Sequence, residues 1–362
     1  MSPGLGTRAR CKAANGKSLC IAAVQMDANP APTTDRLARA ERLVTSTAAA
    51  GAQLTVLPEL FNTGYAYSDE NHTRVEPLDG PTVTWMRDTA ARLGIHLAGS
   101  LMLLDQGQVY NALLLFAPGG RMWRYDKNYP WGWERGYFRE SRRDPQVTVA
   151  DTDLGAIGML ICWDTAHLKL WEGYAGRVDL MVISSCPPDV SDPTFHFPNG
   201  DQVTLEDMGP VMASAKGSSL QVFGDMIDQQ TAWLGVPAVN TVGCGHIRTA
   251  IPNGRLSLLG YAFAAPWLLK YLPRADQLQM SCDMVHECKV VDANGEVLTG
   301  LTQEDGEAFA LAQVRLTGSK PAPQGPQPAA LVSKLVYFLS DVLLPAITKS
   351  VYRRGQRQWR RV

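Results

Sequence analysis

The chain has 362 residues, of which 45% are hydrophobic and 19% are charged, and its formal net charge is -1. These values are typical of a globular protein with a substantial core. The near-zero charge gives no reason to expect nucleic acid as a partner. The seven cysteines are scattered without a CxxC pair, which favours reduced thiols in a cytoplasmic protein over a disulfide framework or a zinc site.

The chain opens on a segment that predicts neither a strand nor a helix. Residues 1–18 contain basic side chains but lack the apolar stretch of a secretory signal, so we expect a flexible N-terminal arm. LCIAAVQM then predicts a strand, and TDRLARAERLVTSTAAAG predicts a helix capped by Thr33 or Thr34. AQLTVLPEL predicts the next strand.

The alternation continues along the chain. PTVTWMRDTAARLG predicts a helix, IHLAGSLMLL a strand, and YNALLLFAPGGRMWRYDKNY a hairpin that turns at Pro118, Gly119 and Gly120. GAIGMLICW and DLMVISSC predict two more strands with a helical segment between them. Strands that alternate with helices indicate an α/β protein with mixed sheets.

Three of these strands end in a polar residue of a catalytic type, namely Glu59, Lys127 and Cys162. Each residue alone is ordinary, because such charges are usually solvated and free cysteines are usually buried. Together, an acid, a cation and a thiol are the groups that acyl transfer through a thioester needs. The lysine and the backbone N–H of Trp163 would stabilise the oxyanion.

The segments VLPELFNTGY, RYDKNYPWGWERG and IGMLICWD resemble, in order, the three signatures of the nitrilase superfamily, the carbon–nitrogen hydrolases. The resemblance implies an α/β fold, the four-layer α-β-β-α sandwich, in a hydrolase domain at 19–316. It also implies that Glu59 is the general base, Lys127 the oxyanion-stabilising cation and Cys162 the nucleophile. A second glutamate that holds the lysine is placed at Glu134, with Glu140 as the alternative.

The step Cys162-Trp163-Asp164 is familiar among carbamoyl-amine hydrolases, whereas nitrilases commonly carry Glu at the third position. The resemblance therefore favours hydrolysis of a linear amide or carbamoyl amine, a non-peptide carbon–nitrogen bond, through a thioester. Three alternatives stay open: a nitrilase, an amide-forming acyltransferase, and a membrane-surface scaffold with a vestigial site. The stretch HLKLWEGYA departs from the family's usual aromatic-Pro-Glu step, which leaves the substrate open.

The expected partner is a small-molecule amide, carbamoyl compound or nitrile. The six histidines show no metal-ligand spacing, so we expect no metal and no cofactor. The resemblance implies a homo-oligomer, a dimer or larger. Cys186 ends another predicted strand, but the sequence assigns it no role.

Residues 256–272, LSLLGYAFAAPWLLKYL, are apolar throughout and lie between two late strands. They supply more aromatic and aliphatic surface than a simple connection requires. We predict an insertion that forms an apolar lid or surface patch near the pocket, with a subunit interface or ordinary core as the alternative.

Past the hydrolase domain, residues 317–329 predict a Pro- and Gln-rich linker, and residues 330–362 an amphipathic basic tail. Lys334, Asp341 and Pro345 disfavour a membrane span. The apolar face comprises Leu331, Leu335, Phe338, Leu339, Val342 and Ile347. The basic end comprises Arg353, Arg354, Arg357, Arg360 and Arg361, with Trp359 among them. This pattern predicts a helix that lies on an anionic membrane, which places a cytoplasmic protein at the inner face of the membrane. The alternative is packing on a second subunit.

Overall fold

The computed structural model describes residues 18–142 and 147–359. Residues 1–17 of the predicted arm lie outside these ranges, as do Arg360 and Arg361 of the predicted tail.

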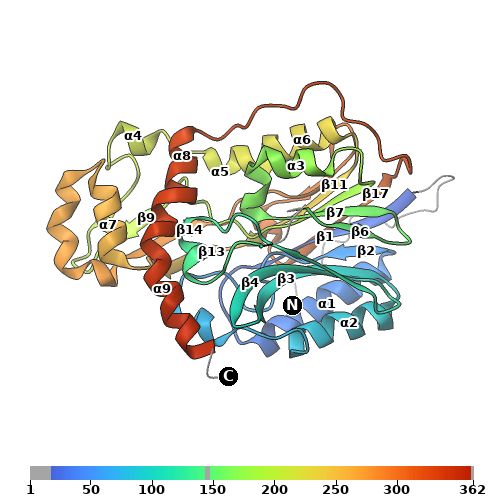
Figure 1. The fold of residues 1–362 in the computed structure, drawn as a ribbon, viewed down its shortest axis with the longest axis horizontal. Helices are drawn as coiled ribbons and strands as arrows, with labels where there is room; N and C mark the ends of the chain where they lie inside the picture. The colour runs from blue at the N-terminus through green and yellow to red at the C-terminus, as the bar shows by residue number, and fades with distance from the viewer. Residues whose placement is uncertain (1–17, 143–146, 360–362) are drawn as a thin grey trace.

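Two mixed sheets form the centre of the molecule (Figure 1). The first has the order β12 (Gly243–Cys244), β1 (Ser18–Asp27), β2 (Leu54–Val56), β3 (His96–Asp105), β4 (Gln108–Phe116) and β5 (Met122–Asp126), with β17 (Ala308–Arg315) antiparallel to β1. The second has the order β16 (Val297–Leu301), β15 (Cys288–Val291), β11 (Ala238–Thr241), β8 (Leu180–Ser184), β7 (Ala156–Ile161) and β6 (Val149–Asp151).

The two faces of β1 show how the layers are built. Ile21 packs into the core between the sheets, together with Met159 and Ile161 of β7. Ala22 and Val24 point the other way, into a second core under the helices. A strand buried on both faces is apolar at nearly every position, as LCIAAVQM is.

Helices cover the outer face of each sheet. The helices over the first sheet are α1 (Thr33–Ala49) and α2 (Pro81–Leu93), and those over the second are α3 (Leu168–Tyr174) and α6 (Ile227–Leu234). The predicted α-β-β-α sandwich is thus confirmed. The predicted cap of α1 is wrong, because Pro32 occupies the cap position, where no side chain accepts a hydrogen bond, and Thr33 is already helical. Proline there fixes a backbone conformation that suits helix entry.

A side lobe projects from the sandwich (Figure 1, left). It contains a small sheet of β10 (Gln202–Val203), β9 (Thr194–His196), β14 (Gln279–Asp283) and β13 (His246–Ala250), with α4 (Pro210–Ala213), α7 (Gly254–Ala262) and the 3₁₀ segment η5 (Pro266–Gln277). The predicted insertion at 256–272 forms most of α7 and the first half of η5. Its Leu268 is buried, whereas Phe263 is 95% exposed.

The chain ends in one continuous helix, Lys334–Trp359, which we call the C-terminal helix. It consists of α8 (Lys334–Phe338), the π-helical turn η7 (Leu339–Leu343) and α9 (Leu344–Trp359). The wider turn ends two residues before Pro345, which cannot donate a backbone hydrogen bond. By length and composition this helix could cross a membrane, but one of its faces packs against the rest of the chain.

The prediction that Trp359 of the tail faces a membrane is wrong. Trp359 is only 4% exposed, and its indole N–H donates to the carbonyl of His72 over 2.8 Å. Arg354 also turns back onto the protein, where its guanidinium pairs with Asp69 at 3.2 Å. Amphipathic spacing identified the helix but could not show which of its large side chains pack inward.

The segment that precedes the C-terminal helix is tied to α6 (Ile227–Leu234). The Gln324 backbone N–H donates to the carbonyl of Trp233 over 2.8 Å, and the Trp233 indole donates to the carbonyl of Gly325 over 3.1 Å. The Gln230 amide donates to the carbonyl of Pro328 over 3.0 Å. These contacts fix the point from which the C-terminal helix begins.

In the part of the chain that the structure describes, five buried cysteines carry free thiols, namely Cys162, Cys186, Cys244, Cys282 and Cys288. Cys20 is disulfide-bonded, so the expectation of reduced thiols throughout is wrong at that position.

Candidate active site

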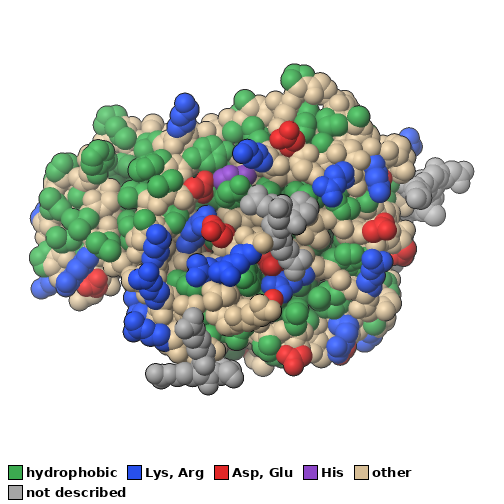
Figure 2. Space-filling view, in the orientation of Figure 1, with side chains coloured by type: hydrophobic (Ala, Val, Ile, Leu, Met, Phe, Trp, Pro, Cys, Tyr) green, Lys and Arg blue, Asp and Glu red, His purple; other side chains and the backbone are tan. Residues whose placement is uncertain are grey.

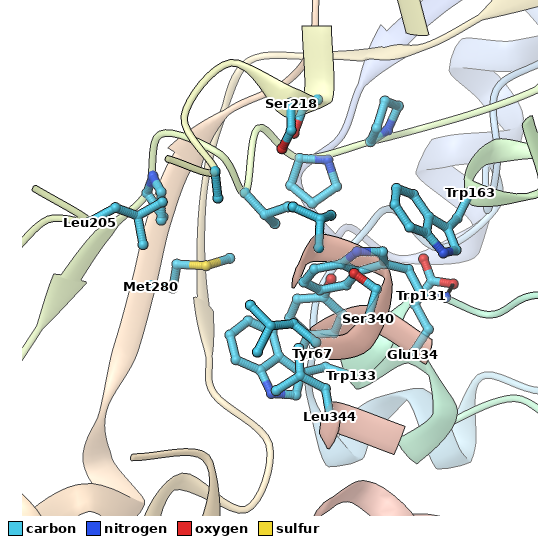
Figure 3. A pocket seen from close by; sticks show the side chains of 18 of the residues that line it. Tyr67, Trp131, Trp133, Glu134, Trp163, Leu205, Ser218, Met280, Ser340 and Leu344 are labelled. Atoms are coloured by element: carbon cyan, nitrogen blue, oxygen red, sulfur yellow. Dashed lines mark hydrogen bonds between the residues drawn. The ribbon is translucent and has the colours of Figure 1, made fainter. Parts of the chain in front are cut away.

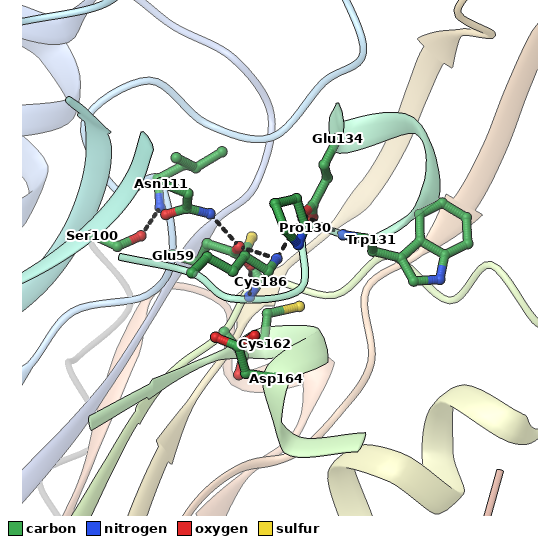
Figure 4. A network of polar contacts seen from close by, with 12 residues as sticks. Glu59, Ser100, Asn111, Pro130, Trp131, Glu134, Cys162, Asp164 and Cys186 are labelled. Atoms are coloured by element: carbon green, nitrogen blue, oxygen red, sulfur yellow. Dashed lines mark hydrogen bonds and ion pairs between the residues drawn. The ribbon is translucent and has the colours of Figure 1, made fainter. Parts of the chain in front are cut away.

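Glu59 lies just beyond β2, in a loop that also contains the left-handed residue Leu60, whose φ is 52°. Its carboxylate is 1% exposed and accepts three hydrogen bonds (Figure 4). Oε1 accepts from the Asn111 amide at 2.6 Å and from Lys127 Nζ at 2.8 Å. Oε2 accepts from the Cys186 backbone N–H at 3.1 Å. These three donors fix the position of the carboxylate.

Lys127 follows β5 directly and is fully buried. Its backbone N–H donates to the carbonyl of Asn111 over 2.9 Å, which continues the pairing of β5 with β4. Its ammonium lies between two carboxylates, 2.8 Å from Glu59 and 2.6 Å from Glu134 Oε2. A buried ammonium is stable only when paired in this way.

Glu134 lies in the 3₁₀ turn η2 (Gly132–Gly136). Oε2 also accepts from the Trp131 backbone N–H at 2.9 Å, and Oε1 accepts from the Tyr65 hydroxyl at 2.5 Å. The alternative residue Glu140 is instead exposed and pairs with Arg135. The structure therefore brings Glu134, and not Glu140, to Lys127.

Cys162 is the first residue after β7 and begins the 3₁₀ turn η3 (Cys162–Ala166). Its φ is 47°, in the left-handed region that a residue with a Cβ adopts at a cost. The turn is stabilised by the Thr165 hydroxyl, which donates to the Cys162 carbonyl over 2.8 Å. The strain ends the strand abruptly, so that the thiol reaches the cavity described below.

The carboxylate of Asp164 holds the same turn in place through three hydrogen bonds. Its Oδ2 accepts from the Tyr125 hydroxyl at 2.7 Å and the Asn128 backbone N–H at 3.3 Å, and its Oδ1 accepts from the Tyr129 backbone N–H at 2.7 Å. Asp164 thus joins the cysteine turn to the chain around Lys127. Burial raises the pKa of Asp164 to about 6, against these donors.

The thiol of Cys162 lies close to both carboxylates. One ligand atom from each of Glu59, Glu134 and Cys162 falls within 4.8 Å of the others. Such a trio could hold a metal ion, but the Lys127 ammonium occupies the position between the two carboxylates. The lysine therefore supplies the positive charge of this cluster.

The pKa directions fit a resting site with a protonated thiol. Burial and the charge of Glu59 raise the pKa of Cys162 well above its usual range, although Lys127 opposes them. Burial also raises the pKa of Glu59, again against Lys127. Burial opposes the charge on Lys127, yet Cys162, Glu134 and Glu59 together hold the pKa of its ammonium well above the ordinary value.

The cluster lies at one end of a cavity of about 1050 Å³, counted with its open mouth (Figure 3). Cys162, Glu134 and Trp163 line that end. The rest of the lining is mostly aromatic and aliphatic, with Phe195 and Met280 from the side lobe. Among the described residues that line the cavity, Glu134 is the one acidic or basic side chain, and it is already paired with Lys127.

The sequence reasoning missed several residues that hold the site. Asn111 directly precedes the apolar run Ala112–Phe116 of β4, and a polar residue beside such a run was the available signal. Tyr65 ends the motif VLPELFNTGY. Cys186 contributes its backbone N–H, which no side-chain pattern reveals. The predicted oxyanion role of the Trp163 N–H stays a prediction.

The insertion contributes to the cavity in part. Ser257, Gly260 and Tyr261 of α7 line it, whereas the other large side chains of the insertion lie elsewhere. Those exposed are Leu256, Leu259, Phe263, Trp267 and Leu269. The segment therefore combines a cavity wall with an exposed apolar surface.

Comparison with known proteins identifies the family. The carbon–nitrogen hydrolase family model matches residues 20–324. A nitrilase from Pyrococcus abyssi is 30% identical over 151 residues, which cover 40% of this chain and 55% of that protein. The omega-amidase NIT2 of Danio rerio is 30% identical over 154 residues, covering 40% and 54%. The chain thus matches about half the length of these curated relatives.

Solved structures show the same fold. An amidase double mutant from Nesterenkonia sp. AN1 in complex with acrylamide superposes with a TM-score of 0.59 at 16% identity, covering 84% of this chain and 93% of that one. A CN-hydrolase superfamily protein from Xanthomonas campestris, with an arsenic adduct in the active site, gives 0.58 at 18% identity, covering 82% and 90%. Taken with the family match, the chain belongs to the carbon–nitrogen hydrolases of the nitrilase superfamily.

Proposed function

We propose that this protein hydrolyses a linear, non-peptide amide through a thioester at Cys162. One observation carries the proposal. The Cys162 thiol faces an apolar cavity from a strained turn, beside two buried carboxylates that Lys127 bridges at 2.8 and 2.6 Å. A nucleophile, a base and a cation are thus held together before substrate binds.

The proposed steps assign one role to each residue. Glu59 accepts the thiol proton while Cys162 Sγ attacks the amide carbonyl carbon. Lys127 and the Trp163 N–H stabilise the oxyanion. As the carbon–nitrogen bond breaks, Glu59 returns the proton to the leaving amine. Glu59 then activates a water molecule that attacks the thioester, which releases a carboxylic acid and the free thiol.

Glu134 acts as a positioning residue in this scheme. It holds the Lys127 ammonium together with Glu59, and Tyr65 and the Trp131 backbone hold it in turn. The proposal is that a lysine fixed by both carboxylates can reach the oxyanion without a change in conformation.

The nearest alternatives differ only in the acyl donor or acceptor. The curated relatives include proteins named nitrilase, omega-amidase and N-carbamoylputrescine amidase. The cavity lining, whose one charged side chain is already paired with Lys127, favours a neutral amide over a cationic carbamoyl amine. A matched amide and nitrile with the same acyl group should separate amidase from nitrilase, because we expect ammonia from the amide. Turnover of the nitrile alone would overturn the proposal.

Two further measurements separate the remaining alternatives. In an amidase, added hydroxylamine should compete only partly with water, whereas an acyltransferase would transfer nearly all acyl groups to the amine. Iodoacetamide should label Cys162 ahead of the other free thiols. Failure to label Cys162 would favour a scaffold protein with a vestigial site.

The substrate can be sought directly with inactive protein. Cys162→Ala protein, incubated with cell extract and analysed by native mass spectrometry, should retain an amide that Glu59→Gln protein also retains. Cys288→Ala protein serves as the control, because its thiol is buried in β15, away from the cavity. It should convert the amide to the acid.

We also propose that the protein binds the surface of an anionic membrane. The exposed stripe of the C-terminal helix begins with Phe338 and Val342, which are 51% and 57% exposed, and continues with the exposed side chains of Lys349, Arg353 and Arg357. Figure 2 shows basic side chains in a column along this helix, beside the apolar surface of the side lobe. Apolar and cationic groups on one surface suit the headgroup region of a bilayer.

A further inference from the structure

The C-terminal helix lies beyond residues 20–324, which match the family, yet it forms part of the cavity. Its side chains Val336, Leu339, Ser340, Leu343 and Leu344 line the same cavity as Cys162 (Figure 3). Ser340 and Leu344 are 1% and 5% exposed. The helix therefore closes one side of the cavity with mainly apolar groups.

Close packing holds the lower part of the helix against η2, the turn that carries Glu134. A Cβ added at Gly132 would lie 2.8 Å from Leu344 Cδ1, and one added at Gly136 would lie 3.1 Å from Val351 Cγ1. Each glycine thus permits a contact that a side chain would obstruct. The helix sits as near to the Glu134 turn as the backbone allows.

Polar contacts tie the upper part of the helix to the turn that begins at Cys162. Asp341 Oδ1 accepts a hydrogen bond from the Trp163 indole N–H at 2.9 Å. Asp341 Oδ2 lies 3.6 Å from His167 Nε2. The Tyr337 hydroxyl donates to the carbonyl of Ala166. The residue next to the nucleophile is therefore held by the C-terminal helix.

The chemistry of the cavity lining limits the substrates that the C-terminal helix can recognise. Within the described residues that line the cavity, the one charged side chain is Glu134, which Lys127 pairs at 2.6 Å. A substrate carboxylate or ammonium deep in this cavity would be buried without a partner, at a large cost in free energy. Apolar groups would instead gain from contact with Leu339 and Leu343.

Building on the proposed amidase function, we infer that the C-terminal helix is the acyl-selecting wall of this chain's own active site. The wall restricts turnover to amides with an uncharged, apolar acyl chain of several carbons. The hydrogen bond between Asp341 and Trp163 fixes the wall relative to Cys162. Asp341 is thus a positioning residue for substrate selection.

The test uses straight-chain primary amides from acetamide to decanamide. For the unmodified protein, kcat/KM should rise by up to about fourfold for each methylene group that contacts the wall. Leu339→Ala and Leu343→Ala should each lower kcat/KM for decanamide by about tenfold, chiefly through KM, and leave acetamide within about twofold. Phe338→Ala and Val342→Ala are matched controls on the exposed face and should change neither value.

The positioning role of Asp341 needs its own readout. Asp341→Ala should flatten the dependence of KM on chain length, whereas Asp341→Asn keeps an acceptor oxygen and should preserve it. Trp163→Phe, which removes the indole donor together with part of the ring, should flatten it too, and combining it with Asp341→Ala should add nothing further. Equal behaviour of Asp341→Ala and the unmodified protein would overturn this part.

Failure of the inference can be distinguished from failure of the proposed function. An unmodified protein that hydrolyses no amide would refute the function. If the unmodified protein hydrolyses every amide equally well, the inferred role of the C-terminal helix is refuted and the proposed function is not. The same holds if Leu343→Ala and Phe338→Ala have equal effects. Calorimetry of decanamide binding to Cys162→Ala protein, with and without Leu343→Ala, measures the wall without any turnover, and a Kd unchanged by Leu343→Ala would also count against it.

Discussion

At the scale of single residues, the ammonium of Lys127 allows two carboxylates to share one buried site. Glu59 and Glu134 both pair with its ammonium, at 2.8 and 2.6 Å. Two carboxylates this close would otherwise raise each other's pKa values until one took up a proton. The lysine keeps Glu59 available as a base and carries the charge that a developing oxyanion needs.

Lys127→Ala should therefore lose stability as well as activity. It leaves two carboxylates buried without a cation, which we expect to lower the free energy of unfolding by about 3–5 kcal/mol. Cys162→Ala should abolish turnover equally but cost only about 1 kcal/mol. Urea unfolding of both variants, beside an amide assay, checks this. Equal unfolding midpoints would show that the ion pairs contribute little to folding.

Activity should be lost on acidification. Glu59 must be a carboxylate to accept the thiol proton, and burial raises its pKa above the ordinary 4.5 even though Lys127 opposes the shift. Below the midpoint Glu59 is protonated and the thiol has no base, so kcat/KM should rise with pH through a midpoint above 4.5. A pH profile of kcat/KM tests this, reporting the coupled cluster as a whole. A midpoint below 4.5 would contradict the assignment.

At the scale of single elements, the turn after β7 combines strain with chemistry. Cys162 has a φ of 47° at the end of a buried strand, where the backbone must leave the sheet. Glycine usually destabilises a buried position relative to a larger residue. At a position with positive φ glycine is favoured instead, because it has no Cβ.

We expect Cys162→Gly to unfold at the same or a higher urea concentration than Cys162→Ala, because relief of strain offsets the lost Cβ by about 1 kcal/mol. Cys288 in β15 is the matched control, a buried cysteine without positive φ. There Cys288→Gly should be less stable than Cys288→Ala. The same order at both positions would show that the turn stores no strain.

The elements also show what sequence can and cannot predict. Buried strands such as β1 were predictable because both faces are apolar, and Glu59 and Cys162 because each follows such a run. The contacts of Asn111 with Glu59 and of Asp341 with Trp163 join residues 52 and 178 positions apart, which local patterns do not encode. For the same reason, helical spacing could not place Trp359 inside.

At the scale of the whole molecule, the exposed face of the C-terminal helix lies beside the side lobe (Figure 1). The Asn253 amide at the start of α7 donates to the carbonyl of Ile347 over 3.0 Å, so helix and lobe are joined. The lobe adds Leu259 and Phe263 to the exposed apolar residues of the helix. The two elements thus present apolar and basic groups together.

Full-length protein should float with anionic liposomes at low salt and be released as salt is raised, because each basic side chain contributes about 1 kcal/mol near such a surface. Replacing Lys349, Arg353 and Arg357 with Glu should abolish flotation without loss of amide turnover. Replacing the buried-face residue Thr348 with Ser is the control. Protein that stays soluble, and forms a dimer that Phe338→Ala weakens, would instead identify this face as a subunit interface.

Because the C-terminal helix follows the catalytic residues in the sequence, the ribosome makes the reactive groups before the groups that select the substrate. Glu59, Lys127 and Cys162 are all made before residue 163, whereas the residues that the C-terminal helix adds to the cavity lining begin at Val336. A chain terminated or clipped after the sandwich would present the thiol in a cavity open on one side. The cell would gain from degrading such truncated chains quickly, since their thiol would be open to oxidants and adventitious electrophiles.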